Sequence, residues 1–121
     1  MQLIEGDCLD ILPTLKDKSI DLILTDPPYG TTACKWDSVI PFEPMWKELK
    51  RIIKDNRAIV LFGSEPFSSA LRMSNIKGYK YDWIWNKKNS GSGLHAKKQP
   101  LKITELIHVF SKNSHNYYPI M

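Results

Sequence analysis

Residues 22–30 of the chain read LILTDPPYG, and this stretch joins an apolar run to a rigid polar turn. Residues 20–25 are almost wholly apolar, which is the pattern of a strand covered on both faces of a sheet. Asp26 follows this run directly, and two prolines, a tyrosine and a glycine come next. We therefore predict a buried strand that ends on a carboxylate at one rim of a sheet.

The segments on either side of this strand alternate between strand and helix patterns. This order predicts an α/β fold with a mostly parallel sheet, formed by residues 1–121 as a single domain. Ligands bind at the carboxyl ends of the strands in such sheets, where Asp7, Asp26 and the pair Gly63-Ser64 fall. The predicted strands are 1–5, 20–25, 58–63, 79–85 and 104–110, and the predicted helices are 8–16, a segment within 41–56, and 64–74.

Three of these elements carry specific expectations. The second helix has an apolar stripe at three–four spacing, formed by Phe42, Met45, Trp46, Leu49, Ile52 and Ile53. The hydroxyl of Ser64 is expected to cap the third helix. Residues 79–85, YKYDWIW, place four aromatic rings on one face of a strand. We expect these rings to belong to the core more than to a stacking surface.

Composition limits the class of protein. Hydrophobic residues make up 42% of the 121 residues, which is enough for a packed core and argues against wholesale disorder. No apolar run approaches the ~20 residues of a membrane span, and the first residues lack the pattern of a secretory signal. Cys8 and Cys34 have no metal-ligand spacing, so we expect two reduced thiols in a cytoplasmic protein and no metal site.

The groups in TDPPYG suit a planar ring that carries an amino group. The Asp26 carboxylate accepts hydrogen bonds from an amine, and the carbonyls of the rigid Pro27 and Pro28 add further acceptors. Tyr29 offers an aromatic face, and stacking on a base contributes about 1–3 kcal/mol. Gly30 lets the backbone turn and lets a ligand approach closely. The alternative is a proline-rich turn in which Asp26 only caps the loop.

Several blocks of the sequence together resemble the DNA amino-methyltransferases. Asp26-Pro27-Pro28-Tyr29 is similar to their catalytic motif, in the form usual for methylation of the 6-amino group of adenine. Glu5-Gly6-Asp7, followed by Ile11-Leu12, looks like the acidic strand end that touches the cofactor. The later blocks KWDSVIPFEPMW, AIVLFGSEPF, WIWNKKN and KKQPLKITELIHVF are similar to family blocks in their usual order. These sequence blocks are most similar to those of phage and prophage methylases, and the resemblance covers essentially the whole chain.

The resemblance implies a Rossmann-like fold and transfer of a methyl group from S-adenosylmethionine (SAM) to the exocyclic amine of a base in DNA. The base is flipped out of the duplex, because its amine is otherwise paired and out of reach. Asp26 and the carbonyl of Pro27 would then accept hydrogen bonds from the amine, while Tyr29 stacks on the base. Asp7 and Cys8, together with Asp26, are expected beside the cofactor. Asp7 is also suited to cap the helix that follows it.

Positive charge is concentrated in the last third of the chain. Residues 79–121 carry seven lysines and two acids, whereas residues 1–78 carry ten Lys/Arg and eleven Asp/Glu. Neutralisation of phosphates dominates affinity for DNA, so we expect phosphate contacts beside the NSGSG loop at 89–93; a solvated loop is the alternative. Trp36, in the predicted loop 30–41, is a stacking candidate, and the three histidines receive no role. The candidate phosphate-binding residues are Lys87, Lys88, Lys97, Lys98 and Lys102.

The order of the blocks also predicts what the chain lacks. In one subclass of the family, the catalytic half precedes a target-recognition region and a Phe-x-Gly-x-Gly cofactor loop. This chain follows that order and contains no Phe-x-Gly, and Asn56-Arg57 stands where a glycine would be the more usual turn residue. We therefore expect an incomplete catalytic domain, a sheet that lacks the strands bearing the cofactor loop, and weak or absent SAM binding by the chain alone.

An incomplete sheet would leave the edge of the strand at 20–25 open, which is a pairing liability. We expect this edge to be covered by self-association, by the first strand moving beside it, or by a complementary C-terminal half. The leading interpretation is the catalytic half of an adenine-specific DNA methyltransferase, as a truncated or split form. The alternatives are a non-catalytic remnant that binds nucleic acid or a partner chain, and an enzyme that acts on the 4-amino group of cytosine or on RNA.

Overall fold

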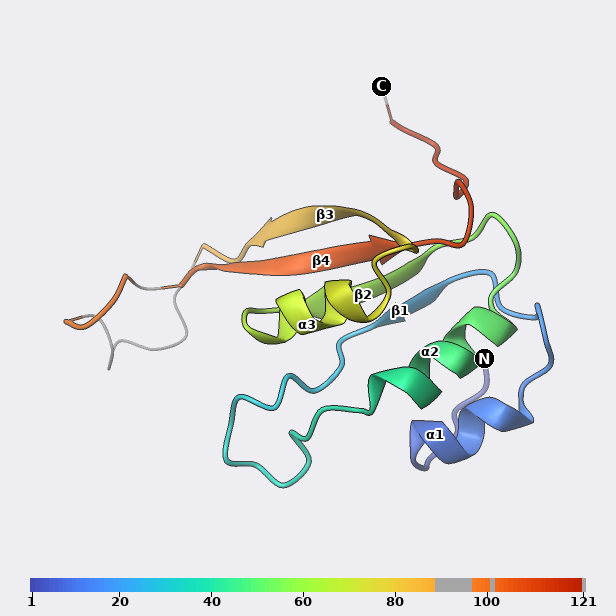
Figure 1. Cartoon of the computed structure of the whole chain (residues 1–121), viewed down its shortest axis with the longest axis horizontal. Coiled ribbons are helices and arrows are strands. Elements are labelled where there is room, and N and C mark those ends of the chain that lie inside the picture. Colours follow the sequence, from blue (N-terminus) through green and yellow to red (C-terminus); the bar gives the residue numbers. More distant parts are fainter. Residues whose placement is uncertain (89–96, 101, 121) are drawn as a thin grey trace.

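A four-stranded sheet organises the molecule (Figure 1). The computed structural model describes residues 1–88, 97–100 and 102–120. The strands are β1 (Ile23–Thr25), β2 (Ile59–Gly63), β3 (Tyr79–Asn86) and β4 (Thr104–Phe110), in the spatial order β1-β2-β4-β3. The helices are α1 (Cys8–Ile11), followed by the 3₁₀ turn η1 (Leu12–Thr14), α2 (Phe42–Ile52) and α3 (Phe67–Ser74).

The α/β class is confirmed, but the pairing of the strands is mixed and not mostly parallel. β1 and β2 pair in parallel, whereas β4 pairs antiparallel with both β2 and β3. β1, β2 and β3 therefore run in one direction, with helices α2 and α3 in the connections between them. Parallel neighbours need a long crossover, usually a helix. β4 instead inserts antiparallel between two strands that run in the same direction.

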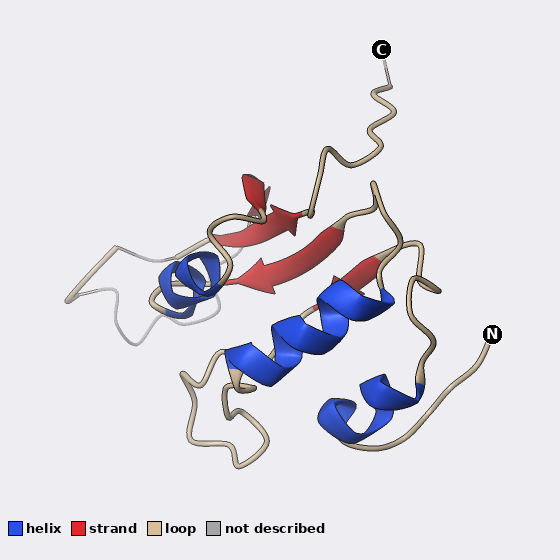
Figure 2. Cartoon of the chain, turned by 45° about the vertical axis from the view of Figure 1, so that its right-hand side comes forward, coloured by secondary structure: helices blue, strands red, loops and turns tan. Residues whose placement is uncertain are grey.

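Helices α2 and α3 cover one face of the sheet and enclose the core (Figure 2). The predicted stripe of α2 is confirmed, since Met45, Trp46, Leu49 and Ile52 are buried. The indole N–H of Trp46 donates to the hydroxyl of Ser74 at 2.7 Å. The Trp46 ring packs edge-on against the Phe110 ring, with ring centroids 4.7 Å apart. One aromatic side chain thus ties α2 to both α3 and β4.

The other face of the sheet is open in the part of the chain that the structure describes. Leu24, Trp83 and Trp85 point to this face and remain 60%, 51% and 47% exposed. The prediction that residues 20–25 are covered on both faces is therefore wrong, because both packed helices lie on the same side. The core assignment for residues 79–85 is wrong at Trp83 and Trp85. A register irregularity between Tyr79 and Tyr81 turns the Tyr79 ring to the helix-covered side, against Phe110.

β1 is shorter than predicted and forms an edge of the sheet. Residues 20–22 contribute only an isolated bridge between Ile20 and Ile53, and regular pairing begins at Ile23. The strand predicted at residues 1–5 is wrong, since these residues are exposed and lie outside the sheet. Movement of that segment beside β1 is therefore not how the described chain covers this edge. Self-association and a complementary half stay predictions.

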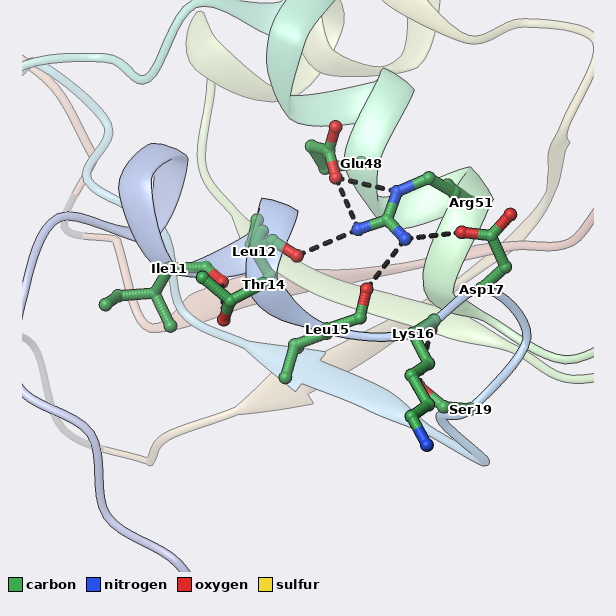
Figure 3. A network of polar contacts seen from close by, with 9 residues as sticks. All are labelled: Ile11, Leu12, Thr14, Leu15, Lys16, Asp17, Ser19, Glu48 and Arg51. Carbon is green, nitrogen blue, oxygen red and sulfur yellow. Dashed lines mark hydrogen bonds and ion pairs between the residues drawn. The ribbon is translucent and has the colours of Figure 1, made fainter.

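A single arginine fastens the N-terminal segment to α2 (Figure 3). The guanidinium of Arg51 donates to the carbonyls of Leu12 and Leu15 at 2.9 and 2.7 Å, which lie at the end of the first helical segment. It also pairs with Glu48 and Asp17. These two carboxylates raise the pKa of Arg51 further, so the fixed charge holds four oxygen acceptors together.

Two turn predictions have different outcomes. Ser64 does not cap α3 through its hydroxyl; the helix begins at Phe67, and the Glu65 carboxylate accepts from the N–H of Ser69 at 3.1 Å. Glu65 lies just before the N-cap Pro66, where the free N–H groups of the first turn and the helix dipole favour a negative charge. Asn56 adopts a left-handed φ of 59°, which explains why asparagine stands where a glycine is more usual.

The open edge and face of β1 predict self-association of the purified chain. Replacement Leu24→Lys should weaken this association by more than about tenfold, because it removes apolar burial and places a charge on an edge strand. Sedimentation velocity across a range of concentrations measures the effect. Met73→Lys, which changes a 70% exposed side chain on α3, is the matched control and should leave the association unchanged. A wild-type chain that stays monomeric at high concentration would contradict this expectation.

Candidate functional site

Four strand ends meet at the rim on which Asp26 lies. Asp26 directly follows β1, and Gly63 ends the parallel neighbour β2. Because β4 is antiparallel, it begins at this rim with Thr104 and Glu105, beside the end of β3. The predicted convergence therefore holds for Asp26 and Gly63 and also includes β4, which is far away in the sequence. It is wrong for Asp7, which follows no strand and caps α1.

The acid and the tyrosine of the DPPY motif contact each other. The hydroxyl of Tyr29 donates to Oδ1 of Asp26 at 2.8 Å. The ring of Tyr29 stacks on Phe67, with centroids 5.2 Å apart and planes inclined by 26°. Pro27 between them is buried, whereas Asp26 is exposed. The motif thus presents the Asp26 carboxylate to solvent, while the stacked rings of Tyr29 and Phe67 anchor the turn.

The environment keeps the Tyr29 hydroxyl protonated. Burial raises its pKa well above the ordinary value, and the hydrogen bond to the Asp26 carboxylate and the charge of that carboxylate act in the same direction. Glu105 also contributes, which is consistent with its position at the same rim. A protonated hydroxyl is a donor, so it holds Oδ1 of Asp26 and leaves Oδ2 without a hydrogen bond among the described residues.

Asp37, which the sequence reasoning did not single out, holds the loop after the motif. Its carboxylate accepts from the N–H of Gly30 at 3.0 Å and from both the N–H and the hydroxyl of Thr32 at 2.7 Å. These bonds lower its pKa, with that from the Thr32 hydroxyl acting most strongly. Gly30 has φ of 70°, and a Cβ there would lie 2.8 Å from a methyl of Val39. The quoted block KWDS contained this acid, but a lone Asp in a loop has no distinctive pattern.

Trp36 lies next to Asp37 and is 74% exposed. The loop around it is fixed by the Asp37 hydrogen bonds, so the indole is presented to solvent from an ordered turn. This placement is compatible with the predicted stacking role, and that role stays a prediction.

A buried histidine lies beneath the rim. Nε2 of His108 is 2.7 Å from the hydroxyl of Ser68, and Nδ1 is 2.5 Å from Oδ1 of Asp82. Arg72 pairs with the second oxygen of Asp82 at 3.2 Å. A Cβ on Gly63 would overlap both Ser68 and His108, so only glycine fits at this end of β2. The sequence reasoning assigned no role to His108, because hydrogen-bond partners 26 and 40 residues away leave no local signal.

The order Ser–His–Asp is familiar from nucleophilic catalysis, but burial excludes that use here. Ser68 and His108 have no exposed surface, so no substrate reaches the hydroxyl. The three side chains instead join α3, β4 and β3. Phe67 precedes Ser68, so this His108 network fixes the ring on which Tyr29 stacks.

The predicted cofactor residues at the N-terminus lie at the start of α1. Asp7 caps this helix, since its Oδ1 accepts from the N–H of Leu9 at 2.9 Å. Cys8 is partly buried, and burial raises the pKa of its thiol, with the charge of Asp7 acting the same way. No hydrogen bond links these two residues to Asp26 in the described part of the chain. Their cofactor role stays a prediction.

The predicted lysines flank the rim, and their roles also stay predictions. Lys87 follows β3 directly and pairs with Glu105 at 2.8 Å, so it is partly neutralised. The NSGSG loop at 89–93 and His95 lie outside the described residues. The remaining candidates are exposed: Lys88, Lys97, Lys98 and Lys102.

The arrangement at the rim is suited to holding an amine and a cation. It offers a carboxylate, proline carbonyls and a protonated phenol, and no described Lys or Arg forms an ion pair with Asp26. Within the described residues, no group of three or more His, Cys, Asp or Glu could hold a metal ion, and no helix is long and apolar enough to cross a membrane.

Comparison with known proteins gives consistent matches. A family model described as DNA methylase matches residues 20–120. The chain is 31% identical over 123 residues to the type II methyltransferase M1.MboII of Moraxella bovis, covering 93% of this chain and 46% of that protein. It is 31% identical over 115 residues to the type II methyltransferase M.HinfI of Haemophilus influenzae, covering 72% and 32%. The chain thus spans less than half the length of these curated relatives.

Solved structures share the fold at low sequence identity. The cytosine-N4-specific PvuII DNA methyltransferase superposes with a TM-score of 0.69 at 15% identity, over 91% of this chain and 48% of that one. The M1.HpyAVI–SAM complex gives 0.63 at 22% identity, over 93% and 54%. A putative DNA modification methylase of Thermus thermophilus, complexed with SAM, gives 0.63 at 18% identity, over 95% and 56%.

The buried histidine is expected to contribute more to stability than any exposed one. Replacement His108→Ala should lower the free energy of unfolding by about 3 kcal/mol or more, because it opens a cavity and leaves Ser68 and Asp82 without their partner. Urea unfolding followed by circular dichroism measures this. His115→Ala, which removes partly exposed hydrogen bonds to Tyr81 and to the carbonyl of Asn116, is the control and should cost less than about 1 kcal/mol. Equal losses in the two variants would contradict a bridging role.

The raised pKa of Tyr29 predicts a loss of stability at high pH. Above the ordinary tyrosine pKa of 10.0 the unfolded chain releases this proton while the folded chain keeps it, so ionisation favours unfolding. Tyr29→Phe removes this contribution, so its melting temperature should fall less than that of the wild type between about pH 9 and about pH 11. Tyr118→Phe alters an exposed ring and should behave like the wild type. An unchanged pH dependence in Tyr29→Phe would argue against a protonated, partly buried phenol.

Proposed function

The chain belongs to the DNA methylase family whose model matches residues 20–120, and from that premise we propose that it forms the catalytic part of an enzyme that methylates the 6-amino group of adenine in DNA. The observation that carries this proposal is the exposed Asp26 carboxylate, held by Tyr29 at the rim where β1 and β2 end. An acceptor fixed in this way suits an amine, and its position at carboxyl strand ends suits a ligand site.

In the proposed reaction, the chain positions the groups and forms no covalent intermediate. Oδ2 of Asp26 and the carbonyl of Pro27 accept hydrogen bonds from the target amine, which keeps the nitrogen lone pair directed at the methyl group. Catalysis then rests on orientation and on fixed acceptors. As the new N–C bond forms, the sulfonium S–CH3 bond of the donor would break and leave a neutral thioether. The amine would lose a proton, which the exposed rim allows to pass to solvent.

Tyr29 has two tasks in this proposal. Its ring is the stacking surface for the flipped base, and its hydroxyl keeps Oδ1 of Asp26 occupied. Because the ring already stacks on Phe67, one of its faces is used by the protein and the other serves the base. Trp36 is proposed to stack on a base, and the lysines beside the rim are proposed to contact phosphates near the flipped base.

SAM is the proposed methyl donor, and it supplies an electrophilic methyl group when bound. The residues present fit a cationic donor, because Asp26 has a free carboxylate oxygen and no described cation pairs with it. Asp7 and Cys8 are proposed to lie near the adenosine part. The sequence contains no Phe-x-Gly, so we propose that the chain alone binds SAM weakly.

Cytosine is the second candidate base, and the specific observation in its favour is the superposition with the cytosine-N4-specific PvuII enzyme. Both bases carry an exocyclic amine, and the groups at the rim do not by themselves distinguish them. A further candidate is a chain without catalysis of its own that binds nucleic acid or a complementary half. Product analysis separates these functions.

The proposed function predicts that methyl transfer depends on Asp26. Residues 1–121 are mixed with the segment of M1.MboII that they do not match, labelled SAM and DNA, and the methylated base is identified by mass spectrometry. N6-methyladenine is expected, and Asp26→Ala should reduce its formation more than about 100-fold, because the fixed acceptor for the amine is lost. Asp21→Ala is the control, since this acid pairs with Lys54 away from the rim. N4-methylcytosine as product would replace adenine with cytosine, and a fully active Asp26→Ala variant would refute the mechanism.

Weak SAM binding by the chain alone is tested by isothermal titration calorimetry. We expect a dissociation constant well above the micromolar range, which corresponds to a binding free energy weaker than about −8 kcal/mol. Micromolar affinity for residues 1–121 by themselves would show that the described rim suffices for cofactor binding.

A further inference from the structure

A second concave site lies at the end of the sheet opposite to the Asp26 rim. It has a volume of about 360 Å³ and is bounded by the end of α2, the turn into β2, and the residues that precede β3 and follow β4. Its floor is apolar and consists of the buried side chains Ile53, Ile59 and Phe110. This volume falls within the range of roughly 300–1,000 Å³ that small-molecule sites occupy.

Cations dominate the wall of this site, which we call the basic pocket. Six cationic side chains and one carboxylate, Asp55, line it, although the whole chain has a net charge of only +4. Asp55 and Asp21 offset part of this charge through pairs with Lys18 and Lys54. Lys50, Lys77 and Lys112 form no ion pair with the described residues. The six cations are Lys18, Lys50, Lys54, Arg57, Lys77 and Lys112.

A buried amide provides a second, independent indication of a ligand. Asn75 lines the pocket and is only 8% exposed, and no hydrogen bond of its side chain is found within the described part of the chain. No fully buried side-chain N or O atom of the described residues lacks a partner, so the amide atoms of Asn75 keep contact with solvent in the pocket. A polar group on a mostly buried residue that opens only into a pocket can pair with a ligand there. The amide lies over Gly78, where a Cβ would come within 2.7 Å of Nδ2 and 2.9 Å of Oδ1. Glycine therefore leaves room for the amide at the pocket wall, where it remains available to a polar group.

We propose that the basic pocket binds a phosphate-bearing nucleotide, either free or at the end of a nucleic-acid strand. The unpaired lysines match the phosphate, the apolar floor matches a flat ring, and the Asn75 amide matches the donors and acceptors of a base edge or a sugar. Inorganic phosphate alone would leave the floor and the amide unused. The pocket and the Asp26 rim lie at opposite ends of β2, roughly 15 Å apart for a five-residue strand, so the two sites are separate.

Calorimetric titration of the full chain tests this proposal with two probes at low ionic strength. The probes are adenosine monophosphate and a single-stranded tetranucleotide with a 5′-phosphate. The double variant Lys77→Glu/Lys112→Glu should bind either probe at least about tenfold more weakly, because two charge-assisted contacts are replaced by repulsion. The matched control Lys16→Glu/Lys47→Glu changes the net charge equally with exposed lysines outside the pocket, and it should bind within about twofold of the wild type.

A second variant separates recognition of the nucleoside from attraction of charge. Asn75→Leu keeps the lysines and a similar side-chain volume, so it should retain pyrophosphate binding while adenosine monophosphate binds about tenfold more weakly. Binding of the mononucleotide identifies a free nucleotide as a source, and binding of the tetranucleotide alone identifies a strand end. The proposal is overturned if neither probe binds the wild type, or if the control double variant weakens binding as much as the pocket variant. None of these titrations depends on methyl transfer.

Discussion

The contact of His108 with Ser68 and Asp82 is the constraint on which the rest of the structure depends. It joins β4, α3 and β3 at a point with no exposed surface on Ser68 or His108, so each hydrogen bond replaces one that water would otherwise make. The same contact explains Gly63, because no side chain fits above it at the end of β2. A rim that presents polar chemistry thus rests directly on a buried polar network that is fully paired, which is what such networks require to stabilise a fold.

Two aromatic rings connect the His108 network to the Asp26 carboxylate. Ser68 fixes the start of α3, Phe67 stands beside it, and Tyr29 stacks on Phe67 while its hydroxyl holds Asp26. The carboxylate is therefore oriented by packing, and its orientation does not depend on a bound ligand. A site that is held in this way before the ligand arrives loses less free energy to reorganisation. Asp37 does the same for the other side of the turn by fixing Gly30 and Thr32.

Local patterns predicted helices α2 and α3 and the ends of β1 and β2, but they could not predict contacts between distant segments or show that residues 1–5 form no strand. The stripe of α2 and the acid after β1 are visible as spacing and as a motif, so both were predicted correctly. His108 was missed because its partners are distant in sequence and the residue itself is a lone histidine. The open face of the sheet was missed because residues 20–25 are apolar whether or not anything covers them. An apolar run shows which side chains of a strand are suited to burial, but whether they are buried depends on the elements that pack against the strand.

Leu24 brings these observations together. It follows the same apolar pattern as Leu61, but Leu61 lies under two helices and Leu24 is 60% exposed at the edge of the sheet. Asp26 is only two residues further on, so the surface that lacks a cover adjoins the proposed site. The described chain builds the side of the site formed by β2, β4 and α3 and leaves the side next to β1 open. A strand that paired with β1 would complete both the sheet and the wall beside Asp26, and it would couple stability of the fold to occupancy of the site.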